Sequence, residues 1–253
     1  MVNRVVFEEA STLKAIVDAV EALVGEASIK LDPEEGLSLA ALDPSKTAMI
    51  QILLPRTYFI EFEAEESGFY GINFTDLSKL LKRVKAKERV ELSFTESAMN
   101  VTAMNSYRKT FELPLMAGEP FELKTLKVDF KAGVRLDSDV LPGVVKDLKI
   151  IGSDVEIYID QEKVEFKTTS DRGKATITVG KEDRALIDVW ADEPSSSIYN
   201  MAYLEKMTKP AKISEETDIE IKTQAPMKLT YPLGGIEGAG ITYYLAHLQV
   251  YVN

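Results

Sequence analysis

The sequence contains no cysteine, one histidine and one tryptophan among its 253 residues. Without cysteine the chain can form neither disulfide bonds nor thiolate metal sites. The single histidine, His247, lies near the end of the chain in the stretch YYLAHLQV. A histidine in such a stretch is more often a packed or surface residue than a catalyst, so few residue types remain for metal or acid–base chemistry.

Long apolar runs are also missing from this chain. No stretch approaches the roughly 20 apolar residues of a membrane-spanning helix. The first ten residues, MVNRVVFEEA, have only Val5, Val6 and Phe7 before two glutamates, which is not the pattern of a secretory signal. We therefore expect an intracellular, cytoplasmic protein with no membrane partner. Apolar residues still make up 45% of the chain, enough for a sizeable core.

Recognisable catalytic motifs are absent as well. The sequence has no GxSxG elbow, no P-loop and no HExxH pair. The glycines of GGIEGAG, residues 234–240, are misplaced for a dinucleotide loop, and we interpret the segment as a hairpin turn. The acidic stretches at 61–67 and 215–218 lack the ligand spacing of an EF-hand. We expect no enzymatic activity, no catalytic residues, no metal and no cofactor.

Positive charge is scarce but concentrated. The chain has 30 Lys and Arg against 41 Asp and Glu, a formal charge of −11, which argues against a uniformly cationic nucleic-acid binder. The segment TDLSKLLKRVKAKE, residues 75–88, nevertheless has five basic residues and only two acidic ones. A local basic surface on an acidic protein therefore remains possible from the sequence.

Two segments of the chain follow the same pattern, residues 24–50 and 151–177. Each follows an amphipathic helix, alternates apolar and polar residues as half-buried strands do, and turns at an aspartate, Asp32 or Asp160. A second aspartate comes 11 residues later in both, Asp43 or Asp171. Chance similarity between two α+β segments is the alternative interpretation.

We interpret the similarity as two related α+β domains with antiparallel sheets. The joint between them contains Gly118 and Pro120 and lacks clean periodicity. The predicted organisation is an N-terminal domain at 1–117, a linker at 118–131 and a C-terminal domain at 132–253.

Apolar periodicity predicts four helices, at 11–24, 75–88, 138–152 and 195–212. Thr75 and Ser138 are the expected N-caps of the second and third. Three of the four helices place lysines on the face away from their apolar stripe. An ordinary solvated face explains each helix alone, whereas a shared basic surface would suit a polyanion.

The order of several segments resembles the proliferating cell nuclear antigen family of archaeal DNA polymerase sliding clamps. The resemblance covers nearly the full length and is carried by LAALDPSKTAMIQILLP (39–55), GINFTDLSKLLKRVK (71–85), VVKDLKIIGSDVEI (144–157), YLEKMTKPA (203–211) and the segment from PMKLTYPL to ITYYLA (226–246). It implies a ring of three subunits, each with two clamp domains, sheets outside and helices inside. Duplex DNA, bound without sequence preference, would pass through the hole.

The resemblance also implies three sets of site residues. The residues expected to face DNA are Lys14, Lys79, Lys82, Arg83, Lys146, Lys149, Lys206 and Lys209. Those expected to hold a partner peptide are Leu42, Met49, Leu123, Leu126, Val128, Pro226, Tyr244 and Ala246. Those expected at the subunit interface are Arg108, Phe111, Leu113, Lys174 and Ile177, on edge strands near 108–115 and 174–179.

The implied function is processivity in DNA replication. The implied partners are DNA polymerase, the clamp loader, flap endonuclease and DNA ligase, through short peptide motifs, together with identical or sister subunits, and the protein would be associated with the nucleoid. A non-identical subunit of a heterotrimeric or checkpoint-type clamp is an alternative. An enzyme acting on a phosphorylated substrate through the lysine-rich helix is a less favoured one.

Overall fold

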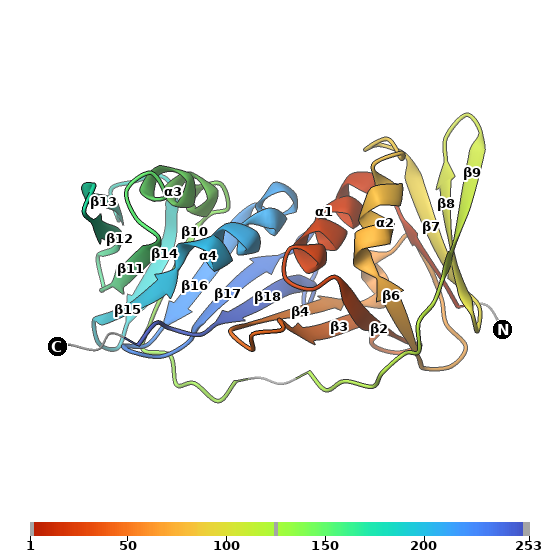
Figure 1. The fold of residues 1–253 in the computed structure, drawn as a ribbon, viewed down its shortest axis with the longest axis horizontal. Coiled ribbons are helices and arrows are strands. Elements are labelled where there is room, and N and C mark those ends of the chain that lie inside the picture. Colours follow the sequence, from red (N-terminus) through yellow and green to blue (C-terminus); the bar gives the residue numbers. More distant parts are fainter. Residues whose placement is uncertain (1–2, 124–125, 250–253) are drawn as a thin grey trace. The chain divides into compact units, whose positions relative to one another are not determined.

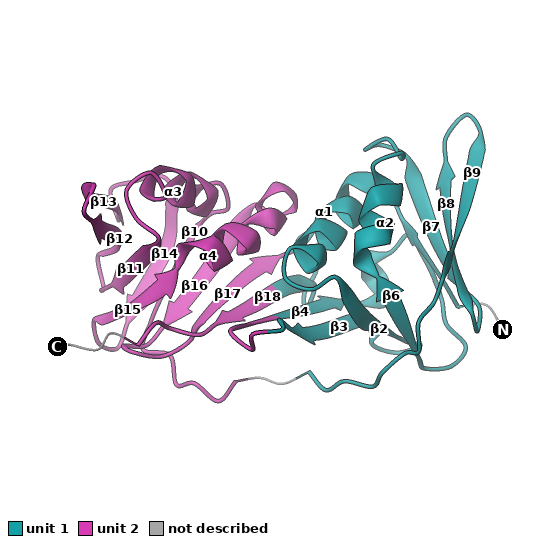
Figure 2. Ribbon diagram, in the orientation of Figure 1, with its two compact units in different colours: residues 1–44, 50–124, 233–241 teal, residues 45–49, 125–232, 242–253 magenta. Residues whose placement is uncertain are grey.

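The computed structural model describes residues 3–123 and 126–249, and the chain divides into two compact units (Figure 2). Unit 1 contains residues 1–44, 50–124 and 233–241, and unit 2 contains residues 45–49, 125–232 and 242–253. Each unit therefore contains one short segment from the other half of the sequence: residues 233–241 in unit 1 and residues 45–49 in unit 2. The predicted boundaries at 117 and 131 stay a prediction, and their ranges include 1–2, 124–125 and 250–253, which lie outside the described residues.

Unit 1 has an antiparallel five-stranded sheet in the order β5-β1-β7-β8-β9, of which Figure 1 labels β7, β8 and β9. Its strands are β1 (Asn3–Phe7), β5 (Glu61–Glu63), β7 (Arg89–Phe94), β8 (Ala98–Met104) and β9 (Arg108–Pro114). Strand β9 pairs with β8 along its whole length, from Arg108 opposite Met104 to Pro114 opposite Ala98. Its other side is the edge of the sheet.

A second group of strands in unit 1 runs in the order β6-β2-β3-β4. These strands are β2 (Glu26–Asp32), β3 (Gly36–Leu42), β4 (Ala48–Leu54), whose first two residues belong to unit 2, and β6 (Gly68–Asn73), and a short 3₁₀ helix, η1 (Arg56–Tyr58), follows β4. The turn from β2 to β3 is closed by Asp32, whose Oδ1 accepts hydrogen bonds from the amides of Glu34 and Glu35.

Helices α1 (Ala10–Glu21) and α2 (Phe74–Leu81) lie side by side in unit 1 and pack against each other (Figure 1). Their apolar stripes are buried, as periodicity predicted, except that Leu80 of α2 is half-buried. The predicted N-cap of α2 was wrong: Asn73 caps this helix, and its Oδ1 accepts the amide of Asp76 at 2.9 Å. Thr75 already lies within the first turn, because the helix begins one residue earlier, at the buried Phe74.

Replacing Asn73 with alanine should lower the free energy of unfolding by about 0.5–2 kcal/mol, because the Asp76 amide loses its acceptor at the helix terminus. Urea denaturation measures the change. Asn73→Ser, which keeps a capping oxygen, should restore most of the loss. Thr75→Ala should cost less than Asn73→Ala, and the reverse order would contradict the assignment.

Unit 2 has an antiparallel four-stranded sheet in the order β13-β12-β11-β15 and a second group in the order β14-β10-β16-β17-β18. The first comprises β11 (Asp154–Ile159), β12 (Lys163–Ser170), β13 (Gly173–Gly180) and β15 (Ser195–Asn200). The second comprises β10 (Ala132–Asp137), β14 (Leu186–Ala191), β16 (Glu216–Ile221), β17 (Met227–Pro232) and β18 (Gly240–Leu245), whose first two residues belong to unit 1. The glycine-rich segment 234–240 is a turn that leads into β18, with positive φ at Gly234, Gly235 and Gly238, as predicted.

Helices α3 (Val140–Leu148) and α4 (Met201–Met207) pack against each other in unit 2, and a 3₁₀ helix, η2 (Lys209–Ile213), follows α4. The predicted helix at 195–212 was wrong in its first six residues, which form β15. Burial alternates there with period two, and β15 pairs antiparallel with β11, so tertiary pairing decides the conformation. Asn200 ends the strand and caps α4 through the amides of Ala202 and Tyr203.

Ser138, the predicted N-cap of α3, does not cap it. Helix α3 begins after Asp139, which makes no side-chain capping bond. The buried Ser138 hydroxyl instead donates toward the carbonyl oxygens of Ala211, at 3.0 Å, and Ser214, at 2.5 Å. It therefore satisfies backbone carbonyls after α4, a use that the local sequence does not reveal.

The internal repeat is confirmed by the order of elements. Helix α1 is followed by β2, β3 and β4, and α3 is followed by β11, β12 and β13. Asp160 repeats the role of Asp32, because its Oδ1 accepts the amides of Glu162 and Lys163. Between the units, residues 118–123 and 126–131 form neither helix nor strand. No helix among the described residues is long and apolar enough to cross a membrane.

Candidate nucleic-acid interface and subunit edges

The predicted basic face of unit 1 lies on α2 and the turn that follows it. Leu77, Leu81 and Val84 are buried, so the opposite side of the helix faces solvent. Lys79, Lys82 and Arg83 are all exposed. Lys79 forms an ion pair with Asp76 at 3.0 Å on the same helix.

Lys82 and Arg83 differ from Lys79 in having no carboxylate partner. Among the described residues, no acidic group lies within ion-pair distance of either side chain. Lys82 is also the C-cap of α2, where the partial negative charge of the helix terminus favours a cation. No neighbouring carboxylate therefore neutralises either positive charge, and both side chains can contact an anionic ligand.

Lys14 on α1 is less available than predicted from sequence. Its side chain is partly buried, and Nζ donates a hydrogen bond to the carbonyl oxygen of Val84. The lysine thus satisfies a carbonyl just after α2 and ties the two helices together. Asp18 and Glu21 lie on the same helix, so α1 contributes little net positive charge.

The basic residues of unit 2 lie on α3, on α4 and at the start of η2. Lys146 and Lys209 are exposed. Lys149 forms an ion pair with Glu205 of α4 at 2.5 Å, and the Lys206 ammonium lies 5.3 Å from the centre of the Tyr203 ring. All eight predicted cations are present on or beside the helices, but Lys79, Lys149 and Lys14 already have partners within the chain.

Both strands predicted at the subunit interface are sheet edges. Strand β9 ends the five-stranded sheet of unit 1, and β13 ends the four-stranded sheet of unit 2. Burial alternates along both: Phe111, Leu113 and Ile177 are half-buried, whereas Arg108 and Lys174 are exposed. Pro114 is the last residue of β9, as expected of a residue that cannot donate a ladder hydrogen bond. Each edge presents free backbone groups to another strand.

Two large exposed side chains beside these edges were missed by sequence analysis. Tyr107, 64% exposed, precedes β9, and its ring lies 5.2 Å from the Lys109 ammonium. Ile150, 68% exposed, follows α3, and its carbonyl accepts a hydrogen bond from Arg172 in the turn before β13. Tyr107 stands in the polar connection NSYRK, whereas Ile150 is one of two adjacent isoleucines after α3, and helical periodicity does not say that either is exposed.

The predicted peptide-binding residues are divided between the units. Leu42 and Leu123 belong to unit 1 and are 50% and 41% exposed. The residues in unit 2 are Met49, Leu126, Val128, Pro226, Tyr244 and Ala246. All of these except Tyr244 are at least partly exposed, and burial of Tyr244 raises the pKa of its hydroxyl. A common hollow formed by the eight residues stays a prediction.

In unit 2 the backbone holds two of these residues in defined positions. The amide of Ala246 donates to the carbonyl of Thr47 at 2.9 Å, which holds Ala246 beside residues 45–49. The amide of Val128 donates to the carbonyl of Leu126 at 2.8 Å and makes a tight turn after the 36%-exposed Leu126 side chain.

Comparisons with known proteins match nearly the whole chain. Residues 2–130 match the model of the proliferating cell nuclear antigen N-terminal domain, and residues 124–248 match that of the C-terminal domain. DNA polymerase sliding clamp 1 of Pyrobaculum aerophilum is 31% identical over 94% of this chain and 95% of its own. The DNA polymerase sliding clamp of Thermococcus gammatolerans is 29% identical over 90% of this chain and 91% of its own.

A solved structure has the same fold. The PCNA2–PCNA3 complex of Sulfolobus tokodaii superimposes on 96% of this chain and 98% of its own chain, with a TM-score of 0.89 and 25% identity. That complex joins two different clamp subunits, PCNA2 and PCNA3. The similarity therefore includes relatives that assemble from non-identical chains.

Proposed function

This chain belongs to the proliferating cell nuclear antigen family, and on that premise we propose that it is a DNA sliding clamp. In this proposal three subunits close into a ring around duplex DNA and tether the replication machinery to it. The protein acts by encircling and tethering rather than by catalysis. The observation that carries the proposal is the gathering of exposed basic side chains on α2 and α3 of a chain whose formal charge is −11.

The electrostatics of this arrangement suit a ring that moves along DNA. Three copies carry −33, three times −11, so the positive surface can act only at short range. Charges attract within about 8 Å at physiological salt, which is one Debye length. Contacts with phosphates carry no sequence information, so the ring can bind any sequence weakly and slide. Closure of the ring, rather than affinity, then keeps the DNA bound.

The two sheet edges supply the means of closure. Each chain has one free edge at β9 and another at β13, so pairing β9 of one copy with β13 of the next is a head-to-tail contact. Head-to-tail contacts form a closed ring when the rotation between copies permits it. The residues of this contact are Arg108, Phe111 and Leu113 on β9 and Lys174 and Ile177 on β13. We extend the same surface to Tyr107 and Ile150, because both expose large apolar area beside these strands.

A ring of non-identical subunits is a second form of the same proposal. It is favoured by the similarity to a complex of two different clamp subunits from Sulfolobus tokodaii. In that form the β9 and β13 edges of this chain pair with sister subunits. The contact chemistry is unchanged, and only the identity of the neighbouring chain differs.

The test of encirclement is topological. Clamp loaded onto a nicked circular duplex should remain bound through gel filtration at high salt, because no contact has to persist for the ring to stay linked. Cutting the same circle with a restriction enzyme should release the clamp, because it slides off the ends. Equal retention on circular and linear DNA would contradict the proposal.

We also propose that DNA polymerase, the clamp loader, flap endonuclease and DNA ligase bind through short peptides at the eight predicted residues. The support is the resemblance to the clamp family together with the exposure of the Leu42, Leu123 and Leu126 side chains. An aromatic anchor inserted among such residues would supply most of the binding energy.

Leu126→Ala combined with Ala246→Asp should weaken a peptide of the form Gln-x-x-aliphatic-x-x-aromatic-aromatic by at least about thirtyfold, because truncation of a hot-spot residue costs about 2 kcal/mol or more. Calorimetry measures the affinity. A control variant, Ile60→Ala with Ala86→Asp, alters an exposed isoleucine and an exposed alanine elsewhere and should bind normally. Unchanged affinity in the first variant would show that the peptide binds elsewhere.

A further inference from the structure

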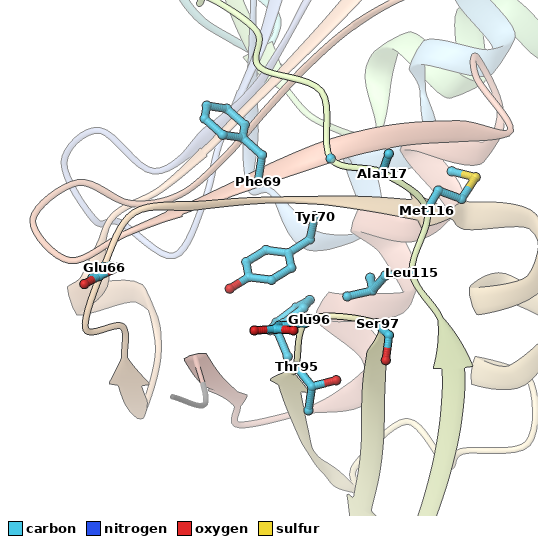
Figure 3. A pocket seen from close by; sticks show the side chains of 11 residues that line it. Glu66, Phe69, Tyr70, Thr95, Glu96, Ser97, Leu115, Met116 and Ala117 are labelled. Carbon is cyan, nitrogen blue, oxygen red and sulfur yellow. The ribbon is translucent and has the colours of Figure 1, made fainter.

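A hollow of about 640 Å³ in unit 1 belongs to none of the surfaces described above (Figure 3). Three separate segments form it: residues 66–70 at the start of β6, residues 94–97 at the turn from β7 to β8, and residues 115–118, which we call the crossing segment. All three lie within unit 1. The hollow therefore depends only on the fold of this unit.

The crossing segment is held firmly against β6. The amide of Leu115 donates to the carbonyl of Ser97 at 2.9 Å, and the amide of Met116 donates to the carbonyl of Gly71 at 2.9 Å. Gly118 lies so close to β6 that a Cβ atom there would come within 2.1 Å of the Phe69 carbonyl oxygen. This wall of the hollow is thus fixed by backbone contacts rather than by adaptable side chains.

The floor of the hollow includes the ring of Tyr70, which packs against the buried ring of Phe94. The rings of Tyr70 and Phe94 lie 4.7 Å apart, and Phe94 is only 1% exposed. The Tyr70 hydroxyl accepts a hydrogen bond from Asn3 Nδ2 at 2.8 Å, which fixes the position of its ring. Figure 3 shows Tyr70 and Leu115 projecting toward the same space. This surface can contact a chain of methylene groups along its length.

The charge of the hollow has a single sign. Its charged lining residues are Glu66 and Glu96, both exposed, and no lysine or arginine lines it. Among the described residues, no cation lies within ion-pair distance of either carboxylate. Glu66 lies before β6 and Glu96 lies in the turn from β7 to β8, so the two carboxylates come from different segments of the lining.

We propose that this hollow binds a linear polyamine. Two protonated amines would donate charge-assisted hydrogen bonds to Glu66 and Glu96, and the hydrocarbon spacer would lie on the half-buried Tyr70 and Leu115. Aromatic faces add attraction for the ammonium groups. A metal ion fits less well, because about 640 Å³ far exceeds the volume of an ion and the described residues contain no group of three metal-ligating side chains.

The test uses calorimetry with spermidine on the full chain. Glu66→Gln with Glu96→Gln should weaken binding by about tenfold or more, because two charge-assisted hydrogen bonds become neutral. The matched control is Glu119→Gln with Glu122→Gln, which removes the same charge from exposed residues of unit 1 outside the hollow and should leave the affinity unchanged. Equal weakening in both variants would overturn the proposal, because diffuse attraction to an acidic protein would explain the binding.

A second arm uses the unaltered protein and diamines from propane-1,3-diamine to octane-1,8-diamine. Two carboxylates carried by different segments of one unit predict an affinity maximum at one spacer length, whereas diffuse attraction predicts no such maximum. The absence of saturable binding by any of these amines would overturn the proposal. So would preferential binding of an arginine-containing tripeptide, which would identify a protein side chain as the occupant. None of these outcomes depends on ring formation or on DNA, so they are separable from the clamp proposal.

Discussion

Replacing Ile177 with lysine should convert the assembled ring into monomers. Ile177 lies in the middle of the edge strand β13 and is half-buried within its own chain, so the rest of its side chain is available to a neighbouring strand. Opposite it, in the proposed pairing, β9 presents Phe111 and Leu113. A lysine there would lose apolar burial and place an ammonium group against apolar side chains.

The closed ring multiplies the effect of this substitution. Full burial of an isoleucine side chain stabilises by about 1.5–3 kcal/mol, and a trimeric ring repeats the contact at three interfaces. A loss of about 2 kcal/mol per interface lowers the trimer association constant by roughly four orders of magnitude, since each 1.4 kcal/mol is a factor of ten. Light scattering after gel filtration should show a mass near three times 28.1 kDa for the unaltered protein and near 28.1 kDa for the variant.

A control on the same strand separates this contact from general damage to β13. Thr178 is the next residue and is exposed, so Thr178→Lys places the same charge on the opposite face of the strand. It should leave the mass unchanged. If the unaltered protein is monomeric alone and trimerises with sister subunits, the same pair of variants is compared in that mixture. A variant Ile177→Lys that retains the full trimer mass would refute the interface.

The sequence predicted the repeated architecture because both halves follow simple periodic rules. Apolar residues at helical spacing placed α1, α2 and α3, and alternation placed the strand pairs that turn at Asp32 and Asp160. Those turns also obey a local rule, since in each an aspartate side chain accepts the amides two and three residues on. Features governed by local spacing were therefore predictable.

The features that the sequence did not predict depend on contacts between distant segments. The stretch 195–200 has helix-compatible residues but forms β15, because β11 offers it a strand partner. Ser138 turns toward carbonyls at 211 and 214 instead of capping α3. Neither choice is encoded within a window of a few residues, since each is decided by packing partners about 40 or more positions away.

The same distinction applies to the candidate DNA surface. Exposure of Lys82, Arg83 and Lys146 followed from the position of each residue relative to a buried stripe. The ion pair of Lys149 with Glu205 and the hydrogen bond of Lys14 to Val84 join segments that are 56 and 70 residues apart. Sequence analysis treated all eight cations alike, whereas the structure distinguishes those without partners from those already engaged.

The residues without partners give the sharpest test of DNA binding. Reversing the charge of Lys82 and Arg83 together should nearly abolish association of the assembled ring with duplex DNA. Each substitution by glutamate changes the local charge by −2, so two substitutions in three copies change the charge of the central hole by −12. Both side chains are exposed and lack carboxylate partners among the described residues, so their removal should not disturb the fold or the β9 and β13 edges.

The dependence on salt identifies the missing interactions as phosphate contacts. Removing one phosphate contact should reduce the slope of log affinity against log salt by up to about 0.9, because fewer counterions are released from the duplex. Fluorescence anisotropy with a labelled duplex over a range of salt concentrations measures both affinity and slope.

Lys79→Glu, which also leaves Asp76 without its partner, should have a smaller effect, because Lys79 is already neutralised in part by that carboxylate. Arg56→Glu with Lys127→Glu gives the same change of net charge at exposed residues outside the four helices and should keep the original slope. If the Lys82 and Arg83 variant keeps the trimer mass and also the slope of the unaltered ring, these residues do not contact DNA and the polyanion surface must be sought elsewhere on the chain.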